Sequence, residues 1–223
     1  LPEETMLDIR GKEIGMIFQD PISSLNPVAT VEKQIVEVLM THTDLGRGQA
    51  RVRAHELLEL VGMPDAARRL DAYPHQLSGG MCQRVVIAMA IACSPSVLIA
   101  DEPTTALDVT VQAQVLALLK KLQADSGMAM IFISHDLSVV RLVCDKVMVL
   151  YLGRVVESGP AADVFNTPQH PYSQALLSAV PGPDPKLART RKHVVLQGDP
   201  PSPISPPSGC VFRTRCPHAQ DAC

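Results

Sequence analysis

One stretch of the sequence, from Gln76 to Asp108, constrains the fold more than any other. Near its start stands LSGG, in which Ser78, Gly79 and Gly80 offer a hydroxyl and two backbone amides without side chains. The apolar pattern that follows predicts a helix beginning here. The first N–H groups of a helix have no partner within the helix, so this sequence is suited to binding an anion.

The same stretch contains two consecutive carboxylates after an apolar run. Residues 97–100 predict a buried strand, and Asp101 and Glu102 follow it directly. In α/β sheets, ligands bind beyond the carboxyl ends of parallel strands. The position of the pair therefore indicates a metal ligand and a base.

Two further apolar runs predict strands that end in polar side chains. Residues 11–18 lead into Gln19, which is suited to orienting water or a metal, or is an ordinary polar loop residue. Residues 129–133 predict a second buried strand, which ends before His135. Because the carboxyl ends of parallel strands meet at one edge of a sheet, we expect His135 to lie at the edge that carries the two carboxylates.

Helical spacing of apolar residues fills most of the sequence between these strands. Helices are predicted at 30–39, 50–61, 79–92 and 108–126. Asp108 is expected to cap the last of these helices and Gly127 to end it. The sequence around Gly153 predicts a hairpin over 147–157. The predicted fold class is α/β with a helical insert and an antiparallel addition.

Bulk composition excludes some classes of partner. A formal net charge of −3 and a pI near 6.2 give no basic footprint, so nucleic acid is not an expected partner. No apolar run approaches the roughly 18 residues that span a bilayer, so membrane contact is expected to go through a partner. Residues 1–8 do not resemble a secretory signal, and the default location is cytoplasmic.

Composition changes beyond Gly159, where frequent prolines predict an appendage outside the sheet. Six cysteines are present. Cys82, Cys93 and Cys144 stand singly within apolar helical patterns and are expected to be reduced thiols. The other three gather near the C-terminus at Cys210, Cys216 and Cys223, with His218 nearby. Three thiols and a histidine are a possible zinc site, and structural thiols without metal are the alternative.

The motifs, taken in order along residues 11–160, resemble the nucleotide-binding subunit of ABC ATPases. They are Gln19, Ser78–Gly80, Asp101 with Glu102, Asp108 and His135. The resemblance makes them, respectively, the Q-loop glutamine, the signature, the end of the Walker B strand, the D-loop aspartate and the switch histidine. Each motif is weak alone, but five in this order and spacing are specific.

This resemblance implies ATP and Mg²⁺ as ligands, with ATP clamped between two homologous subunits that face each other head to tail. Asp101 and Gln19 are then expected to hold Mg²⁺, and Glu102 to polarise the attacking water. Gln19 is also expected to sense the γ-phosphate, and His135 to contact it. The signature and the D-loop aspartate are expected to act on the nucleotide of the partner.

The C-terminal region narrows the resemblance. The chain is similar here to ATP-binding subunits of dipeptide, oligopeptide and nickel importers. The similarity is carried by the sequence TPQHPYSQALLSAVP, by the later cysteines and by Met81 in the signature. That family implies transmembrane permease partners, an indirect link to an extracytoplasmic solute-binding protein, and a peripheral place on the cytoplasmic face of the membrane. It also implies a possible four-iron cluster on Cys210, Cys216 and Cys223. The expected division is an ATPase domain over 1–160, with a helical subdomain at about 28–92, and an extension over 161–223.

The pattern GxxxxGK[ST], which holds the β- and γ-phosphates in this class, is not present in the sequence. We therefore expect a fragment of a longer subunit, inactive alone, whose chain begins downstream of that loop. Two other functions stay open at this point: a soluble ABC ATPase acting in DNA repair or translation, and a non-catalytic fragment.

Overall fold

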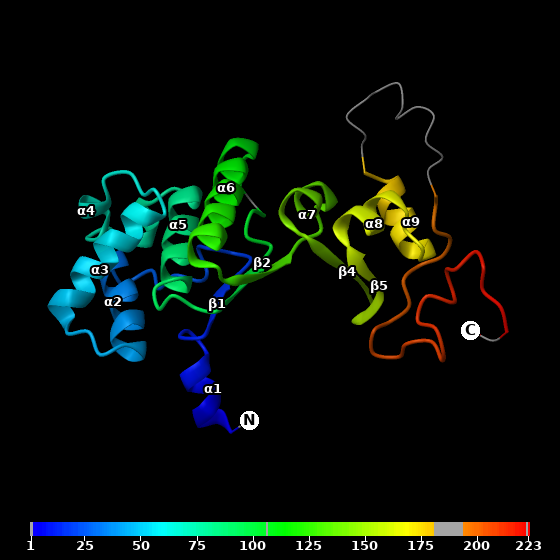
Figure 1. Cartoon of the computed structure of the whole chain (residues 1–223), viewed down its shortest axis with the longest axis horizontal. Coiled ribbons are helices and arrows are strands. Elements are labelled where there is room, and N and C mark those ends of the chain that lie inside the picture. The colour runs from blue at the N-terminus through cyan, green and yellow to red at the C-terminus, as the bar shows by residue number, and fades with distance from the viewer. Residues whose placement is uncertain (1, 106, 181–193, 222) are drawn as a thin grey trace. The chain divides into compact units, whose positions relative to one another are not determined.

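The computed structural model describes residues 2–105, 107–180, 194–221 and 223 (Figure 1). The chain divides into two compact units at the bond between His135 and Asp136. We call residues 1–135 the N-terminal unit and residues 136–223 the C-terminal unit. The domain boundary at residue 160 and the limits of the helical subdomain stay predictions.

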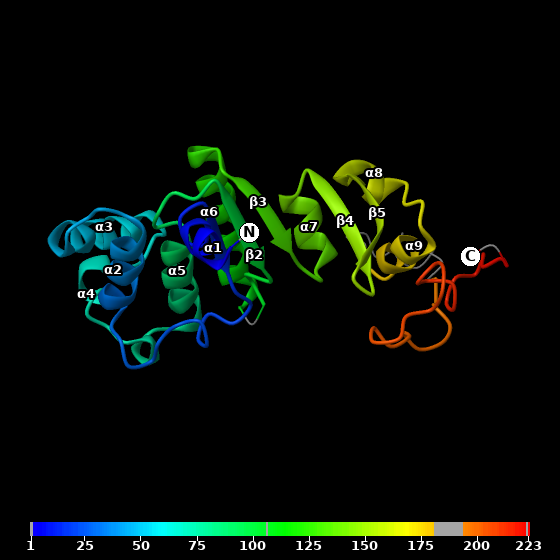
Figure 2. The same cartoon turned by 90° about the horizontal axis from the view of Figure 1, so that it is seen from below.

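The N-terminal unit contains a parallel sheet of three strands in the order β1-β2-β3. Two of these strands, β2 and β3, are labelled in Figure 2. The strands are β1 (Ile14–Ile17), β2 (Val97–Asp101) and β3 (Ala129–Ile133). Ile17 pairs with Ala100, and Ala100 pairs with Phe132, so all three strands end at one edge. The predicted α/β class and the positions of these strands are confirmed.

Helices make up most of the remaining N-terminal unit. They are α1 (Glu3–Ile9), α2 (Val31–His42), α3 (Arg47–Leu60), α4 (Ala66–Arg69), α5 (Gly79–Ala90) and α6 (Val109–Ser126), with a 3₁₀ turn at Pro74–Gln76. Local signals set their ends as expected. The Asp108 side chain accepts a hydrogen bond from the Val111 N–H at 3.0 Å, and Gly127 ends α6 with φ of 69°.

One face of the sheet packs against the helices. Ile17, Leu98 and Ala100 point to this face and are buried. Gly15 lies so close to α5 that a Cβ atom at this position would stand 2.2 Å from the carbonyl oxygen of Ala90. A side chain is therefore excluded from the centre of β1, and the close approach fixes the sheet against α5.

The opposite face of the sheet is partly open to solvent, which corrects one expectation. Residues 129–133 were predicted as a buried strand, yet Ile131 and Ile133 are 50% and 46% exposed. Met16 and Phe18 on β1 and its extension are exposed on the same face, at 37% and 52%. Alternate residues of a strand point to opposite faces, so the core packed on one face partly buries Met130 and Phe132 and leaves Ile131 and Ile133 exposed.

The C-terminal unit is built around an antiparallel hairpin, as predicted. Its strands are β4 (Lys146–Tyr151) and β5 (Arg154–Pro160), joined by a tight turn with Gly153 at φ of 73°. Among the described residues of this unit, three helices accompany the hairpin: α7 (Leu137–Val143), α8 (Ala161–Asn166) and α9 (Pro171–Ser178). The described residues from 194 onward contain no helix or strand. Instead, Val211 and Phe212 of this segment are buried in a cluster with Tyr151.

Across the described ranges, none of the helices combines the length and the apolar character that a bilayer span requires.

Candidate functional site

Glu102 is the centre of a cluster at the carboxyl edge of the parallel sheet. Its Oε2 accepts hydrogen bonds from Gln19 Nε2 and from Thr105 Oγ1, both at 2.9 Å. Its Oε1 lies 3.0 Å from Nδ1 of His135. The structure thus brings together Gln19, Glu102 and His135, the three residues predicted to be catalytic. In the sequence, Gln19 lies 83 positions and His135 lies 33 positions from Glu102.

The topology of the sheet explains this convergence. Gln19 follows β1, Glu102 follows β2 and His135 follows β3, and the three parallel strands end at one edge. The Glu102 backbone is left-handed, with φ of 45°, a conformation that costs free energy for a residue with a side chain. Its N–H donates to the Ile133 carbonyl at 2.9 Å, which holds the strained residue against the end of β3.

The surroundings of Glu102 favour its ionised form. The hydrogen bond with His135 lowers the pKa of the Glu102 carboxyl most, and the Thr105 hydroxyl lowers it further. A carboxylate has about four lone-pair positions, and the three contacts described above occupy three of them. One acceptor position on Oε1 is therefore left for a water molecule or another donor.

The predicted anion site lies at the start of α5, with the geometry expected of a helix cap. Ser78 has extended backbone angles, and its side chain accepts a hydrogen bond from the Met81 N–H at 3.4 Å. Ser78 and Gly79 are exposed, and a Cβ atom at Gly79 would meet nothing within 4 Å. The first turn of α5 is therefore open to a ligand. None of the hydrogen bonds found among the described residues connects it to Glu102.

Comparison with known proteins decides the family. A model described as "ABC transporter" matches residues 2–105, and a model described as "Oligopeptide/dipeptide transporter, C-terminal region" matches residues 156–223. Over its whole length the chain is 51% identical to a peptide import ATP-binding protein of Brucella melitensis and 50% identical to the dipeptide transport ATP-binding protein of Escherichia coli. The chain belongs to the ATP-binding subunits of ABC peptide importers.

Membership of this family confirms the resemblance drawn from the motifs and the expected function as an ATP-binding transport subunit. The chain spans 67% of the length of these two relatives. Among solved structures, the ATP-binding cassette MJ0796, a dimer bound to ADP and phosphate, superposes with a TM-score of 0.64 at 31% identity. That match covers 72% of this chain and 68% of the cassette. ABC importer subunits of this kind are ATPases that take ATP and Mg²⁺.

The residues expected to hold Mg²⁺ suit a hard cation. Asp101 ends β2 and is partly exposed, so its carboxylate is accessible at the edge of the sheet. The amide nitrogen of Gln19 donates to Glu102, which leaves the amide oxygen as the group that a cation can use. Carboxylate and amide oxygens are typical Mg²⁺ ligands, and Mg²⁺ often takes only one or two protein ligands beside substrate phosphates.

Thr105 is a member of the cluster that the sequence analysis missed. Its hydroxyl donates to Glu102, and its N–H donates to the Glu102 carbonyl at 3.1 Å in a turn that contains Pro103. The signal was present in the sequence, because a hydroxyl three residues after a carboxylate in a proline-containing turn is placed to donate back to it.

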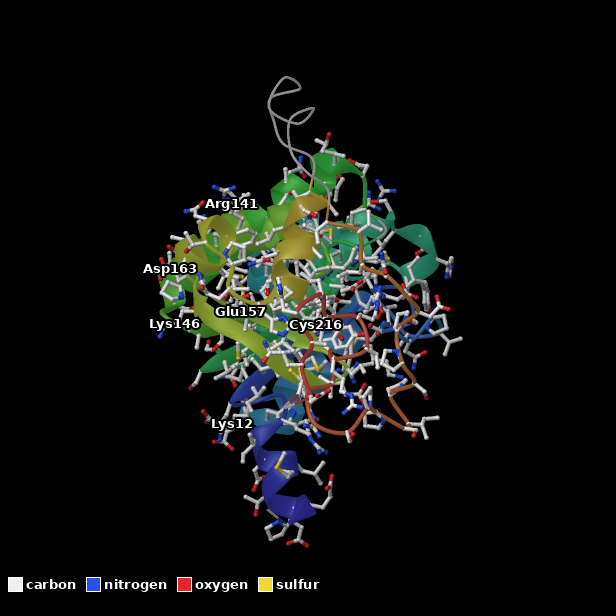
Figure 3. The ribbon with its side chains drawn as sticks, turned by 90° about the vertical axis from the view of Figure 1, so that its right-hand side faces the viewer. Lys12, Arg141, Lys146, Glu157, Asp163 and Cys216 are labelled. Atoms are coloured by element: carbon white, nitrogen blue, oxygen red, sulfur yellow. The ribbon has the colours of Figure 1, made fainter. Side chains whose placement is uncertain are left out.

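The C-terminal cysteines do not form a metal-binding group within the part of the chain that the structure describes. Cys216, labelled in Figure 3, packs against the cluster of Tyr151, Val211 and Phe212. The Cys210 N–H donates to the Cys223 carbonyl at 2.8 Å, so backbone contact closes the loop between these two residues. All six cysteines are free thiols, including Cys82, Cys93 and Cys144 as predicted.

Proposed function

We propose that this chain supplies the catalytic carboxylate for ATP hydrolysis that drives peptide import. The observation that carries the proposal is the convergence of Gln19, Thr105 and His135 on Glu102 at the carboxyl edge of the sheet. A carboxylate held ionised by three partners, with one acceptor position left, is placed to accept a hydrogen bond from an attacking water.

In the proposed reaction a water molecule attacks the γ-phosphorus of ATP, and the bond from that phosphorus to the bridging oxygen of ADP breaks. ADP and inorganic phosphate are released, and Glu102 accepts the proton of the water. Glu102 orients and polarises that water through its remaining acceptor position. Gln19 and His135, which flank Glu102, reach the γ-phosphate when it is bound and exchange their contacts with Glu102 for contacts with phosphate oxygens. Asp101 and the amide oxygen of Gln19 would hold Mg²⁺, which when bound would neutralise charge on the phosphates.

The signature at the start of α5 acts on a second nucleotide in this proposal. Ser78 and Gly79 are exposed, and the first turn of α5 offers N–H groups to a phosphate. Asp108 begins the next helix along the chain. Two homologous subunits in a head-to-tail pair would place the signature and Asp108 of each against the ATP held by the other.

We assign the membrane contact to the loop that follows Gln19. Ile22 and Val28, three and nine positions after Gln19 in the sequence, are 62% and 82% exposed in this loop and would offer apolar side chains to a permease partner. Permease subunits docked there would carry the peripheral subunit on the cytoplasmic face of the membrane, and the solute-binding protein would act through them. Because the relatives are named for peptide and dipeptide transport, di- and oligopeptides are the proposed cargo, with nickel as the alternative.

A four-iron cluster forms no part of the proposal. Such a cluster needs cysteine thiolates that converge, and the described residues around Cys216 place that side chain among apolar groups instead.

The experiment compares Glu102→Gln with Glu37→Gln, an exposed glutamate on α2 that serves as the matched control. Both are introduced into a chimera in which these 223 residues replace the matching part of the Escherichia coli dipeptide transport protein, assembled with its membrane subunits. Loss of the base should lower ATP turnover about 10²- to 10⁴-fold while ATP binding is kept. Normal turnover by the Glu102→Gln chimera would contradict the assignment.

The 223 residues taken alone should bind ATP weakly, because they contain no glycine-rich loop with its phosphate-binding lysine. Titration of the chain with ATP and Mg²⁺ measures this directly. Binding at micromolar concentration would show that the signature and the Walker B edge suffice to hold the nucleotide, against our expectation.

A further inference from the structure

The helix that carries the signature and the helix that carries the D-loop aspartate touch at their first turns. A Cβ atom on Gly80 would stand 2.8 Å from Cγ1 of Val111, well inside normal contact distance. The N–H of Val111 in turn donates to the Asp108 side chain at 3.0 Å. Val111 therefore contacts the signature through its side chain and the D-loop aspartate through its backbone.

A second contact lies one turn further along both helices. Arg84 of α5 donates through Nη2 to Oε1 of Gln114 of α6 at 3.1 Å. The same guanidinium donates through Nη1 to the carbonyl oxygen of Val61 at the end of α3. Gly62 follows with φ of 70°, and a Cβ atom there would lie 3.1 Å from that nitrogen. Arg84 thus joins three helices of the N-terminal unit, two of which, α5 and α6, are neighbours in Figure 1.

We propose that Val111 and Gln114 are positioning residues that fix the signature relative to Asp108 through Gly80 and Arg84. The inference rests on the proposed function, in which the signature and Asp108 face the same nucleotide of a partner subunit. Two groups that act on one ligand need a fixed separation, since small displacements of positioned groups are costly in catalysis. The contacts of Gly80 with Val111 and of Arg84 with Gln114 hold the signature and Asp108 at a fixed separation before any nucleotide binds.

The two glycines of the signature accordingly have different roles. Around Gly79 there is open space, so its missing side chain leaves room for a ligand. At Gly80 the space that a side chain would take is filled by a methyl group of Val111. A β-branched side chain on a helix has one strongly preferred rotamer, so Val111 cannot easily turn aside. Glycine at position 80 therefore leaves the space that Val111 fills where the first turns of α5 and α6 meet.

The first test measures unfolding of the chain by urea without nucleotide. Gly79→Ala should keep or raise the transition midpoint, because alanine favours helix over glycine. Gly80→Ala should shift the unfolding equilibrium constant about tenfold toward the unfolded state through overpacking. In a Val111→Ala background the same change should alter that constant less than about twofold. Equal losses in both backgrounds would overturn the proposal.

The second test measures ATP turnover in the chimera described above. Gly80→Ala should lower kcat, and the added Val111→Ala change should restore most of it with little effect on KM. Recovery of stability without recovery of kcat would overturn the positioning role. Failure of the proposed function gives a different result: Ser78→Ala would then keep normal turnover, while the urea experiment would still show the coupling of Gly80 to Val111.

For the second contact, Gln114→Glu keeps an acceptor for Arg84 and should preserve kcat, whereas Gln114→Leu removes the acceptor and should lower it. Equal kcat values for these two variants would exclude Gln114 from the positioning role.

Discussion

Replacing Phe212 with alanine should release the C-terminal segment from the hairpin of the C-terminal unit. Phe212 is fully buried, and its ring centroid lies 5.1 Å from that of Tyr151, 5.6 Å from that of Tyr172 and 5.3 Å from that of His170. His170 and Tyr172 belong to the HPY sequence that marks the importer family. Through these contacts Phe212 attaches the segment to β4 and α9, together with Val211 of the same cluster.

The magnitude follows from the size of the buried ring. Truncating a buried phenylalanine to alanine costs about 3–5 kcal/mol. If about 3 kcal/mol of this is lost from the attached state of the segment, its detached population rises about 10²-fold. Cys216 is partly buried against the same cluster, so its thiol becomes available when the segment detaches. Its reaction with a thiol reagent should accelerate, by at most about the same factor because Cys216 is already partly exposed in the attached state.

The assay follows labelling of Cys216 by mass spectrometry of its peptide, with the native chain and two variants. Val195→Ala is the control, because Val195 lies in the same segment but is 81% exposed. Labelling of Cys216 should be unchanged in the control and much faster in Phe212→Ala. A Phe212→Ala rate within about twofold of the native rate would refute the claim that this ring attaches the segment.

Three further predictions concern other parts of the chain. Thr105→Val should raise the pKa of Glu102, because one hydrogen bond to the carboxylate is lost, and Thr105→Ser should not; the acidic limb of the pH profile of turnover reports the difference. Burial alone would raise the pKa of Glu157, yet the Gln169 N–H, the Ser173 side chain and the His170 N–H together outweigh it and lower the pKa below its ordinary 4.5. This stabilisation is therefore present above about pH 4.5 and lost as pH falls through the lowered pKa. Urea unfolding should show that Glu157→Gln loses less free energy of unfolding than the native chain when the pH is lowered through this range. The open sheet face should bind an apolar dye, and Ile131→Lys should reduce its fluorescence, whereas an unchanged signal would place the dye elsewhere.

Local sequence determined where most elements begin and end. Thr30, Ser78 and Asp108 cap their helices through side chains that reach N–H groups only a few residues away. Gly127 ends α6 because it adopts positive φ without a steric penalty. Such signals involve neighbours in the chain, so they can be recognised without knowledge of the fold. The order of the motifs likewise indicated the protein family, since this order can be read from the sequence alone.

Tertiary structure alone decided which side chains meet and which faces are covered. The sequence placed His135 at the edge that carries Glu102, but only the register of three parallel strands set the hydrogen bonds that join them. It predicted β3 as a buried strand, because an apolar run has the same composition whether one face of the strand or both are covered. The sequence predicted Gly80 as part of an anion site. The structure shows in addition that a side chain at this position would collide with Val111 of α6. Each of these outcomes depends on contacts between residues far apart in the chain, and spacing along the sequence carries no information about such distances.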